Sequence, residues 1–218
     1  MELIKVQKGY LTILTGKTDM GKSTITVYEC RENLRNGQKV IFFSYEYCQS
    51  IICNKLVSHF NCGWSQMLNL NIVDASNISL NSLVAYAKAK KDNVDIIYVD
   101  YLDLLKNATY PKAQSEAEDF EQIKEICKAL AKLAKELDVP VVLLSQIGAS
   151  SDFEKAVARL NAFSETVKDK NVIKMFIGKG NIIDTRIDFS DITQIILVDG
   201  YNLKLFSSLN IKEIYGDR

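Results

Sequence analysis

The chain has 218 residues, which is enough for one domain with a sizeable core, and its 27 basic and 27 acidic residues cancel to a formal net charge of zero. A neutral chain excludes long-range attraction to nucleic acid or an anionic membrane as a property of the whole protein, so any polyanion site has to be a local cluster of basic side chains. No apolar run approaches the roughly 20 residues that span a bilayer, and the first residues lack the pattern of a signal peptide, so we expect a cytoplasmic protein without a membrane segment.

Strand-like and helix-like segments alternate through the first two thirds of the chain. Short β-rich apolar runs predict strands, and apolar residues at a spacing of three or four predict helices. In chain order these elements are strand 11–15, helix 22–35, strand 39–44, helix 48–60, strand 70–73, helix 80–91, strand 95–101, helix 116–137 and strand 139–145. Residues 106–115 have the composition of a loop. The alternation predicts an α/β fold with a mostly parallel sheet that is flanked by helices on both faces.

The pattern is weaker in the C-terminal third of the chain. Residues 151–168 predict a polar helix, and residues 172–177 predict a strand. Two further β-rich runs, 191–198 and 202–206, predict a hairpin turned by Asp199-Gly200. This C-terminal β-hairpin would extend the sheet at its far end.

A phosphate-binding loop lies between the first predicted strand and the first predicted helix. Residues 16–23 are G-K-T-D-M-G-K-S, which matches G-x-x-x-x-G-K-[ST] without a mismatch. Backbone N–H groups and the helix N-terminus would bind phosphate, Lys22 the outer phosphates, Ser23 Mg²⁺ and Thr24 an inner phosphate. A chance match is the alternative, and the strand–loop–helix context favours function. The predicted nucleotide-binding residues are Gly16, Lys17, Thr18, Asp19, Met20, Gly21, Lys22, Ser23 and Thr24.

Three polar residues stand where predicted strands end. Asp100 closes I-I-Y-V-D, where it would hold Mg²⁺ through water, although aspartate also caps turns and helices. Glu46 follows K-V-I-F-F-S and could polarise an attacking water, and the residues alone equally allow a solvent-exposed loop glutamate. Gln146 follows V-V-L-L-S and could sense a γ-phosphate, or simply lie in a loop.

Several residues of zinc-binding type cluster between positions 48 and 62. Cys48, Cys53, His59 and Cys62 are irregularly spaced on a predicted amphipathic helix, so we expect them to pack rather than to bind zinc. Trp64 follows this helix, and we expect it to anchor in the core.

Four segments together resemble the ATPase domain of DnaB-type replicative helicases. They are GYLTILTGKTDMGKST, GQKVIFFSYEY, DIIYVDYLDLL and EICKALAKLAKELDVPVVLLSQI, and the resemblance covers roughly residues 8–147. It implies a RecA-like P-loop core that couples ATP hydrolysis to movement along single-stranded DNA as a ring of six. By this resemblance Lys22 and Ser23 bind the phosphates and Mg²⁺, Asp100 is the metal-side aspartate, and the catalytic residues are Glu46 and Gln146, together with Lys22.

The resemblance also sets the expected organisation and partners. We expect a single RecA-like ATPase domain over residues 1–218, with the motifs in a core over about 8–147 and a less regular part over 148–218. ATP and Mg²⁺ are the implied cofactors. Single-stranded DNA, further copies in a homo-hexamer, or another replication protein are the implied partners.

Some features depart from the family pattern. Asp199-Gly200 stands where the family places a basic pair that reaches the neighbouring nucleotide, and Lys179, Arg186 or Lys204 could substitute. Loss of such a basic finger can cost about 10³–10⁵ in turnover, which predicts a slow ATPase. The chain also begins almost at the first strand, so we expect it to lack the family's docking helix, which leaves ring formation open.

The segments that correspond to the family's DNA-contacting loops, 106–119 and 147–165, contain few basic residues. We therefore expect weak, salt-sensitive DNA binding. Two alternatives follow. One is a nucleotide-binding accessory or regulatory protein of RecA fold with little motor activity. The other is a recombinase-type or circadian-type relative of RecA, which S-Y-E-Y and V-D-Y-L favour less than a DnaB-like chain.

Overall fold

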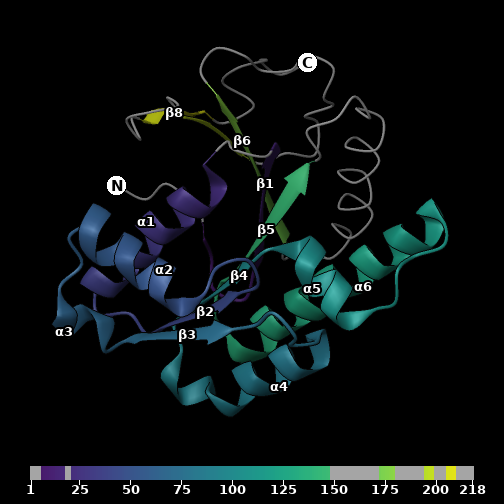
Figure 1. Cartoon of the computed structure of the whole chain (residues 1–218), viewed down its shortest axis with the longest axis horizontal. Coiled ribbons are helices and arrows are strands. Elements are labelled where there is room, and N and C mark those ends of the chain that lie inside the picture. The colour runs from purple at the N-terminus through teal and green to yellow at the C-terminus, as the bar shows by residue number, and fades with distance from the viewer. Residues whose placement is uncertain (1–5, 18–20, 148–171, 180–193, 199–204, 210–218) are drawn as a thin grey trace.

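The computed structural model describes residues 6–17, 21–147, 172–179, 194–198 and 205–209 (Figure 1). Its strands are β1 (Leu11–Lys17), β2 (Val40–Ser44), β3 (Leu70–Asp74), β4 (Ile96–Asp100), β5 (Val141–Ile147), β6 (Val172–Lys179), β7 (Gln194–Val198) and β8 (Leu205–Leu209). Its α-helices are α1 (Lys22–Arg35), α2 (Gln49–Asn54), α3 (Trp64–Met67), α4 (Leu80–Ala89), α5 (Leu102–Thr109) and α6 (Glu116–Leu137). A π-helical turn, η1 (Lys55–His59), and a 3₁₀ turn, η2 (Lys91–Asn93), complete the described elements.

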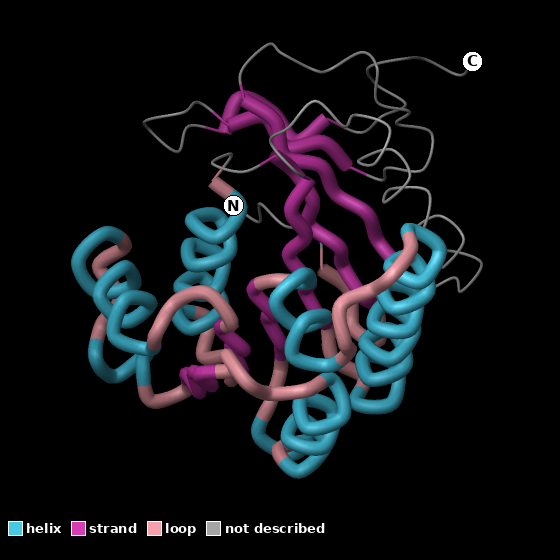
Figure 2. The backbone as a smooth tube through the Cα atoms, turned by 45° about the vertical axis from the view of Figure 1, so that its right-hand side comes forward, coloured by secondary structure: helices cyan, strands magenta, loops and turns pink. Residues whose placement is uncertain are grey.

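The strands form one sheet in the order β3-β2-β4-β5-β1-β6-β7-β8. All neighbours pair in parallel except β7 and β8, which are antiparallel. Helices α1, α2 and α3 lie on one face, and α4, α5 and α6 lie on the other (Figures 1 and 2). The structure thus confirms the predicted α/β class and the mostly parallel sheet.

Each central strand is buried on both faces. In β4, Ile97 and Val99 belong to the core that α4, α5 and α6 cover, whereas Ile96 and Tyr98 belong to the core beneath α1 and α2. Successive strand residues point to opposite faces, so a strand with helices on both sides has to be apolar throughout. This is why the sequence presents these strands as unbroken apolar runs.

The longest helix, α6, has the bounds that its sequence pattern predicts. Ser115 caps its N-terminus by accepting a hydrogen bond from the backbone N–H of Glu118 at 3.2 Å, and acidic residues occupy the first turn. The apolar stripe faces the sheet, with Ile126 and Leu130 fully buried. Asp138 ends the helix in a left-handed conformation with φ 53°.

Helix α1 also matches its predicted bounds, and Asn36 and Gly37 cap its C-terminal end. Gly37 has a φ of +76°, a region that favours glycine. The backbone N–H of Gly37 bonds to the carbonyl of Leu34 at 3.0 Å. This bond satisfies a carbonyl that the end of a helix would otherwise leave unpaired.

Other expectations about local structure were wrong. The predicted loop at 106–115 begins inside α5, which tertiary packing stabilises because Leu102 and Leu105 are fully buried. The helix predicted over 48–60 divides into α2 and the π-helical turn η1, and the short helix α3 was not predicted. The second hairpin strand is β8, which begins three residues later than expected, while the predicted helix 151–168 lies outside the described residues.

Trp64 is not a core anchor. Its side chain is 76% exposed on α3, and the neighbouring Leu68 is 87% exposed. Cys62 is buried as expected and Cys53 is half-buried, but Cys48 and His59 are exposed, so the packing interpretation is wrong for these two residues. Among the described helices, none has the length and apolar composition needed to cross a membrane.

Candidate functional site

The carboxyl ends of four neighbouring strands bring the predicted site residues to one edge of the sheet. Ser44 pairs in register with Asp100 across β2 and β4, and Gly16 pairs with Gln146 across β1 and β5. Alternation along the strands places Asp100 on the same face as Tyr98, which is the face that α1 covers. Ligands of open α/β sheets bind at this edge, where helix N-termini also point.

The phosphate-binding loop joins β1 to α1 at this edge. Lys22 is buried, and its Nζ donates a hydrogen bond to the carbonyl oxygen of Gly16 at 2.8 Å. Gly21 caps α1 with a φ of +85°, which a residue with a side chain adopts only under strain. Gly16 lies within β1 and has no positive φ, so only Gly21 shows the backbone freedom expected of both glycines. Residues 18–20 lie outside the described residues.

Asp100 is a buried carboxylate in contact with the start of α1. Burial raises its pKa to about 6, and the negative charge of Glu46 acts in the same direction. A hydrogen bond from the Ser23 hydroxyl and the positive charges of Lys55 and Lys22 oppose this rise. The structure therefore brings Ser23, Lys22 and Asp100 together, which are the residues expected to meet the phosphates and the metal ion.

The oxygen ligands of Ser23 and Asp100 suit Mg²⁺. This ion prefers hard oxygen donors, and it is usually held by one or two protein groups together with phosphate oxygens. Asp100 is only 2% exposed, so a bound cation would offset part of the cost of burying its charge. We conclude that these two residues fit a Mg²⁺ site.

Glu46 lies in a turn that is fixed on both sides. The Ser44 hydroxyl donates to the carbonyl of Tyr47 at 2.6 Å and accepts from the N–H of Tyr47 at 3.2 Å. The N–H of Tyr45 bonds to the carbonyl of Asp100 at 2.8 Å, and the Tyr45 hydroxyl donates to the carbonyl of Ile78 at 3.0 Å. Glu46 itself is exposed, and the turn holds it beside Asp100.

Gln146 is half-buried at the end of β5, one strand away from Asp100. Its register with Gly16 places it next to the start of the phosphate-binding loop. The structure thus brings Gln146 to the same edge as Lys22, Asp100 and Glu46. Such a position is adjacent both to the phosphates and to the segment that follows β5.

The sequence analysis missed one basic residue at this edge, Lys55. Its Nζ lies 4.3 Å from the centre of the Tyr47 ring, and its charge lowers the pKa of Asp100. Lys55 starts the π-helical turn η1, a geometry that often marks functional sites. Its presence in the helix after Glu46 was the available signal, but the sequence alone does not fix the direction of its side chain.

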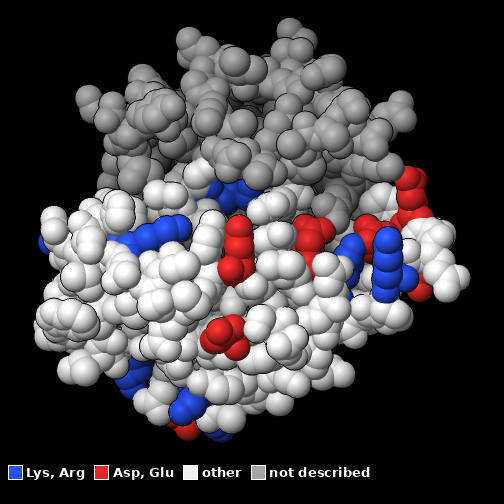
Figure 3. All heavy atoms as spheres, in the orientation of Figure 1, with Lys and Arg blue, Asp and Glu red and all other residues white. Residues whose placement is uncertain are grey.

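The segment expected to contact DNA is held by its own side chains. Lys106 forms a short ion pair with Asp119, and both side chains are mostly buried. The Tyr110 hydroxyl donates to Glu125 at 2.8 Å, and Gln122 donates to the carbonyl of Pro111 at 3.3 Å. Figure 3 shows basic and acidic side chains interspersed on this face of the molecule rather than a basic patch.

The second expected DNA-contacting segment and two of the candidate basic substitutes fall outside the part of the chain that the structure describes. These are residues 148–165, Arg186 and Lys204. Lys179 ends β6, and only its backbone is described.

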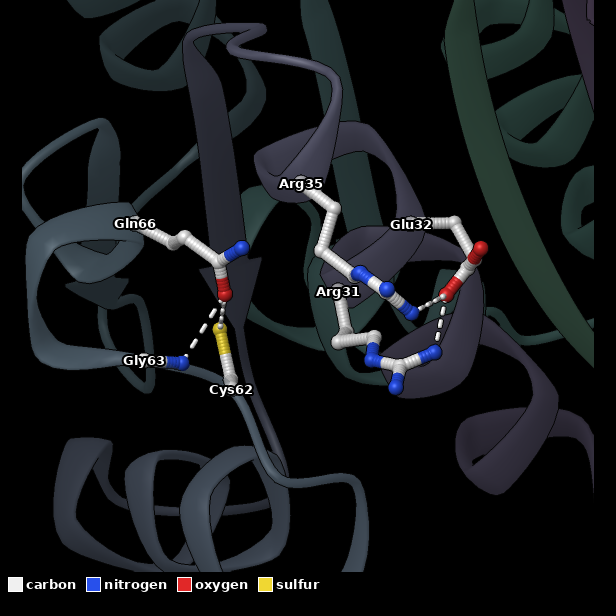
Figure 4. Close-up of polar contacts among 6 residues, drawn as sticks. All are labelled: Arg31, Glu32, Arg35, Cys62, Gly63 and Gln66. Carbon is white, nitrogen blue, oxygen red and sulfur yellow. Dashed lines mark hydrogen bonds and ion pairs between the residues drawn. The ribbon is translucent and has the colours of Figure 1, made fainter.

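The cysteine-rich segment forms hydrogen bonds within a local turn. Within the described residues there is no group of three or more His, Cys, Asp or Glu side chains that could hold a metal ion. Figure 4 shows the Cys62 Sγ directed at the Gln66 Oε1 at 3.5 Å, and the same oxygen accepts from the Gly63 N–H at 2.8 Å. Nearby, Arg31 and Arg35 share the carboxylate of Glu32. These contacts stabilise the local turn and the end of α1.

Comparisons with known proteins agree with this geometry. The chain matches the DnaB-like helicase C-terminal domain family over residues 60–159. It is 28% identical over 173 residues to the replicative DNA helicase DnaB of Treponema pallidum (strain Nichols), which covers 67% of this chain and 38% of that protein. The chain therefore spans less than half the length of this curated relative.

Two solved structures share the fold. One is an isolated ATPase domain, which has a TM-score of 0.56 at 18% identity, and the match covers 88% of this chain and 70% of that chain. The other is a DnaB-like replicative helicase, described together with its interactions with primase, which has a TM-score of 0.55 at 19% identity. That match covers 88% of this chain and 47% of the helicase chain. The match to the DnaB-like helicase family and the similarity to DnaB proteins do not favour the accessory-protein alternative.

Proposed function

We propose that the chain is a DnaB-like helicase domain that binds ATP with Mg²⁺ and hydrolyses the nucleotide, as its similarity to the DnaB-like family supports. The observation that carries the proposal is the cluster at the carboxyl edge of the sheet. There the Ser23 hydroxyl bonds to the buried Asp100 carboxylate, and Lys22 reaches back over the phosphate-binding loop to Gly16.

Each residue of the cluster has a chemical role in this proposal. Lys22 exchanges its bond to Gly16 for the outer phosphates, and Thr24 bonds to an inner phosphate. Ser23 and Asp100 hold Mg²⁺, which when bound neutralises phosphate charge and favours departure of the leaving oxygen. Glu46, which the turn at Ser44–Tyr47 presents to solvent, orients the attacking water and accepts its proton.

Gln146 is proposed to link the nucleotide to the nucleic acid. Its place beside Gly16 lets its amide detect a terminal phosphate, and its bond would change when that phosphate leaves. The chain segment after β5 follows directly from Gln146, so a change there passes to that segment.

We further propose that hydrolysis drives movement along single-stranded DNA in replication, in the cytoplasm. Ring formation with further copies of the chain is part of this proposal, since a motor of this kind needs a basic group from a neighbour or a substitute for it. The internal pairing of Lys106 with Asp119 supports weak DNA binding, because it leaves one cation fewer for contacts with phosphates.

The first test is steady-state ATP hydrolysis with and without single-stranded DNA, compared with Lys22→Ala. We expect Mg²⁺-dependent turnover that increases with DNA and that falls by about 10²–10³-fold in the variant, since Lys22 is a positioned cation at the phosphates. Turnover that DNA does not change would reject the motor part of the proposal and retain the ATPase. Turnover that persists in Lys22→Ala would reject the assigned site.

A further inference from the structure

We propose that Lys55 is a second phosphate-binding lysine of this site, which contacts the terminal phosphate of ATP from the same chain. The proposal rests on the proposed ATPase function and extends it to a residue outside the phosphate-binding loop. It gives the site a second cation from the same chain, in addition to Lys22.

The position of Lys55 follows from the structure around Glu46. Tyr47 is fixed to the end of β2 by two hydrogen bonds with Ser44, and Ser44 pairs in register with Asp100. The Lys55 ammonium lies over the Tyr47 ring at 4.3 Å. Lys55 therefore reaches the same sheet edge as Asp100, although it follows the C-terminal end of α2.

The charges of the site support this placement. Asp100 is buried, and both Lys55 and the phosphate-loop lysine, Lys22, lie close enough to act on its negative charge. Within the described residues Lys55 has no carboxylate at ion-pair distance. Its ammonium therefore acts on the site without being neutralised by a direct partner.

The contact with Tyr47 is one that a phosphate can replace. A cation over an aromatic ring is held less strongly than a cation in a charge-assisted hydrogen bond to a phosphate oxygen. The lysine side chain is flexible, so a rotation about its own bonds would move the ammonium from the ring to a nucleotide bound at the loop. The ring then serves as the resting position of the cation.

Lys55 would act on the hydrolysis step itself. The water oxygen forms a bond to the terminal phosphorus, the bond from that phosphorus to the bridging oxygen breaks, and its electron pair stays on ADP, while Glu46 accepts the water proton. Negative charge is spread over the terminal phosphate oxygens during this exchange. The Lys55 ammonium at those oxygens stabilises this charge, and it returns to the Tyr47 ring once the phosphate has left.

The test compares triphosphate with diphosphate binding. Fluorescent analogues of ADP and of slowly hydrolysed ATP are titrated, with Mg²⁺, into the wild type and into Lys55→Ala, Lys55→Arg and Lys132→Ala. Lys132 is an exposed lysine on α6, so its variant controls for loss of a surface charge. We expect Lys55→Ala to weaken triphosphate binding by about 10- to 100-fold, because a hydrogen bond to a charged group is lost, and to leave diphosphate binding within about twofold.

The remaining variants separate this role from a structural one. Lys55→Arg keeps the cation and should retain most of the preference for triphosphate, and Lys132→Ala should match the wild type. Equal weakening of both nucleotides, or no weakening in a Lys55→Ala protein whose melting temperature is unchanged, would overturn the proposal while leaving the ATPase assignment in place. A wild type that binds neither analogue would overturn both.

Discussion

The nucleotide end of the sheet and the α5–α6 segment use their charged side chains in opposite ways. At the sheet edge Asp100 is buried with a raised pKa, Glu46 points into solvent, and Lys55 rests on an aromatic ring. In the α5–α6 segment Lys106 is already paired with Asp119. The charged groups of the first region can therefore bind a charged ligand, whereas the lysine of the second region is already neutralised by a carboxylate of the same chain.

This difference has a physical meaning. A buried carboxylate costs stability until a cation or a hydrogen-bond donor arrives, so it marks a place where a ligand can contribute binding energy. An internal ion pair has the opposite effect, since a phosphate must displace the carboxylate before it can bind the lysine. The molecule should therefore bind nucleotide more tightly than it binds DNA.

The largest expected effect comes from removing the proposed general base. Glu46→Gln should lower ATP turnover by about 10²-fold or more while the affinity for ATP stays near that of the wild type, because the amide cannot accept the water proton. Glu121→Gln, at an exposed position on α6, is the matched control. Turnover and affinity are measured on the same preparations, and a Glu46→Gln protein as fast as the wild type would show that Glu46 is a surface residue only.

The next effect concerns the stability of the nucleotide end. Because the pKa of Asp100 is raised from 3.8 to about 6, the folded state binds its proton more tightly than the unfolded state. The stability that this proton contributes is fully present below pH 3.8 and is lost as the pH rises through about 6. The Asp100→Asn variant has no such loss. In the absence of nucleotide and Mg²⁺, its free energy of unfolding at pH 8 should therefore exceed that of the wild type by on the order of 2 kcal/mol.

Urea unfolding of both proteins between pH 4.5 and 8 measures this difference. The advantage of Asp100→Asn should grow with pH up to about 6 and then level off. Adding Mg²⁺ and nucleotide should stabilise the wild type more than the variant, because only the wild type keeps the carboxylate ligand. If the difference in free energy of unfolding between the two proteins does not change with pH, burial does not raise the pKa of Asp100.

A smaller effect should come from opening the α5–α6 segment. Asp119→Asn removes the partner of Lys106, so affinity for single-stranded DNA should rise a few-fold, and its salt dependence should steepen by about 0.7 in slope for one added phosphate contact. Glu121→Gln lies nearby on α6 and removes the same charge from a different ion pair. Fluorescence anisotropy at several salt concentrations measures both variants, and equal gains in the two would indicate a general charge effect rather than release of Lys106.

The smallest effect is expected outside both regions. Trp64→Ser should change the free energy of unfolding by no more than about 0.5 kcal/mol, because the side chain is 76% exposed. Urea unfolding at neutral pH provides the measurement. A loss of several kcal/mol would restore the original expectation that Trp64 anchors the core.

The sequence was most informative where local and global signals agree. The bounds of α1 and α6 follow from their caps and apolar stripes, and the order of strands and helices predicts the parallel sheet. It was least informative where packing decides. Helix α5 is short and forms against buried neighbours, and Trp64 is a large apolar residue that the fold leaves outside.

By itself the sequence determined the phosphate-binding loop and the polar residues at the strand ends, because a loop of this kind depends on a few adjacent residues. The tertiary structure alone decided which charges meet there. The register of β2 with β4 and of β1 with β5 brings Asp100 and Gln146 to the loop, and the π-helical turn after α2 brings Lys55 beside them. Strand register and side-chain direction depend on residues far apart in the chain, so no local pattern could have shown that Lys55 belongs to the site or that Lys106 is already paired.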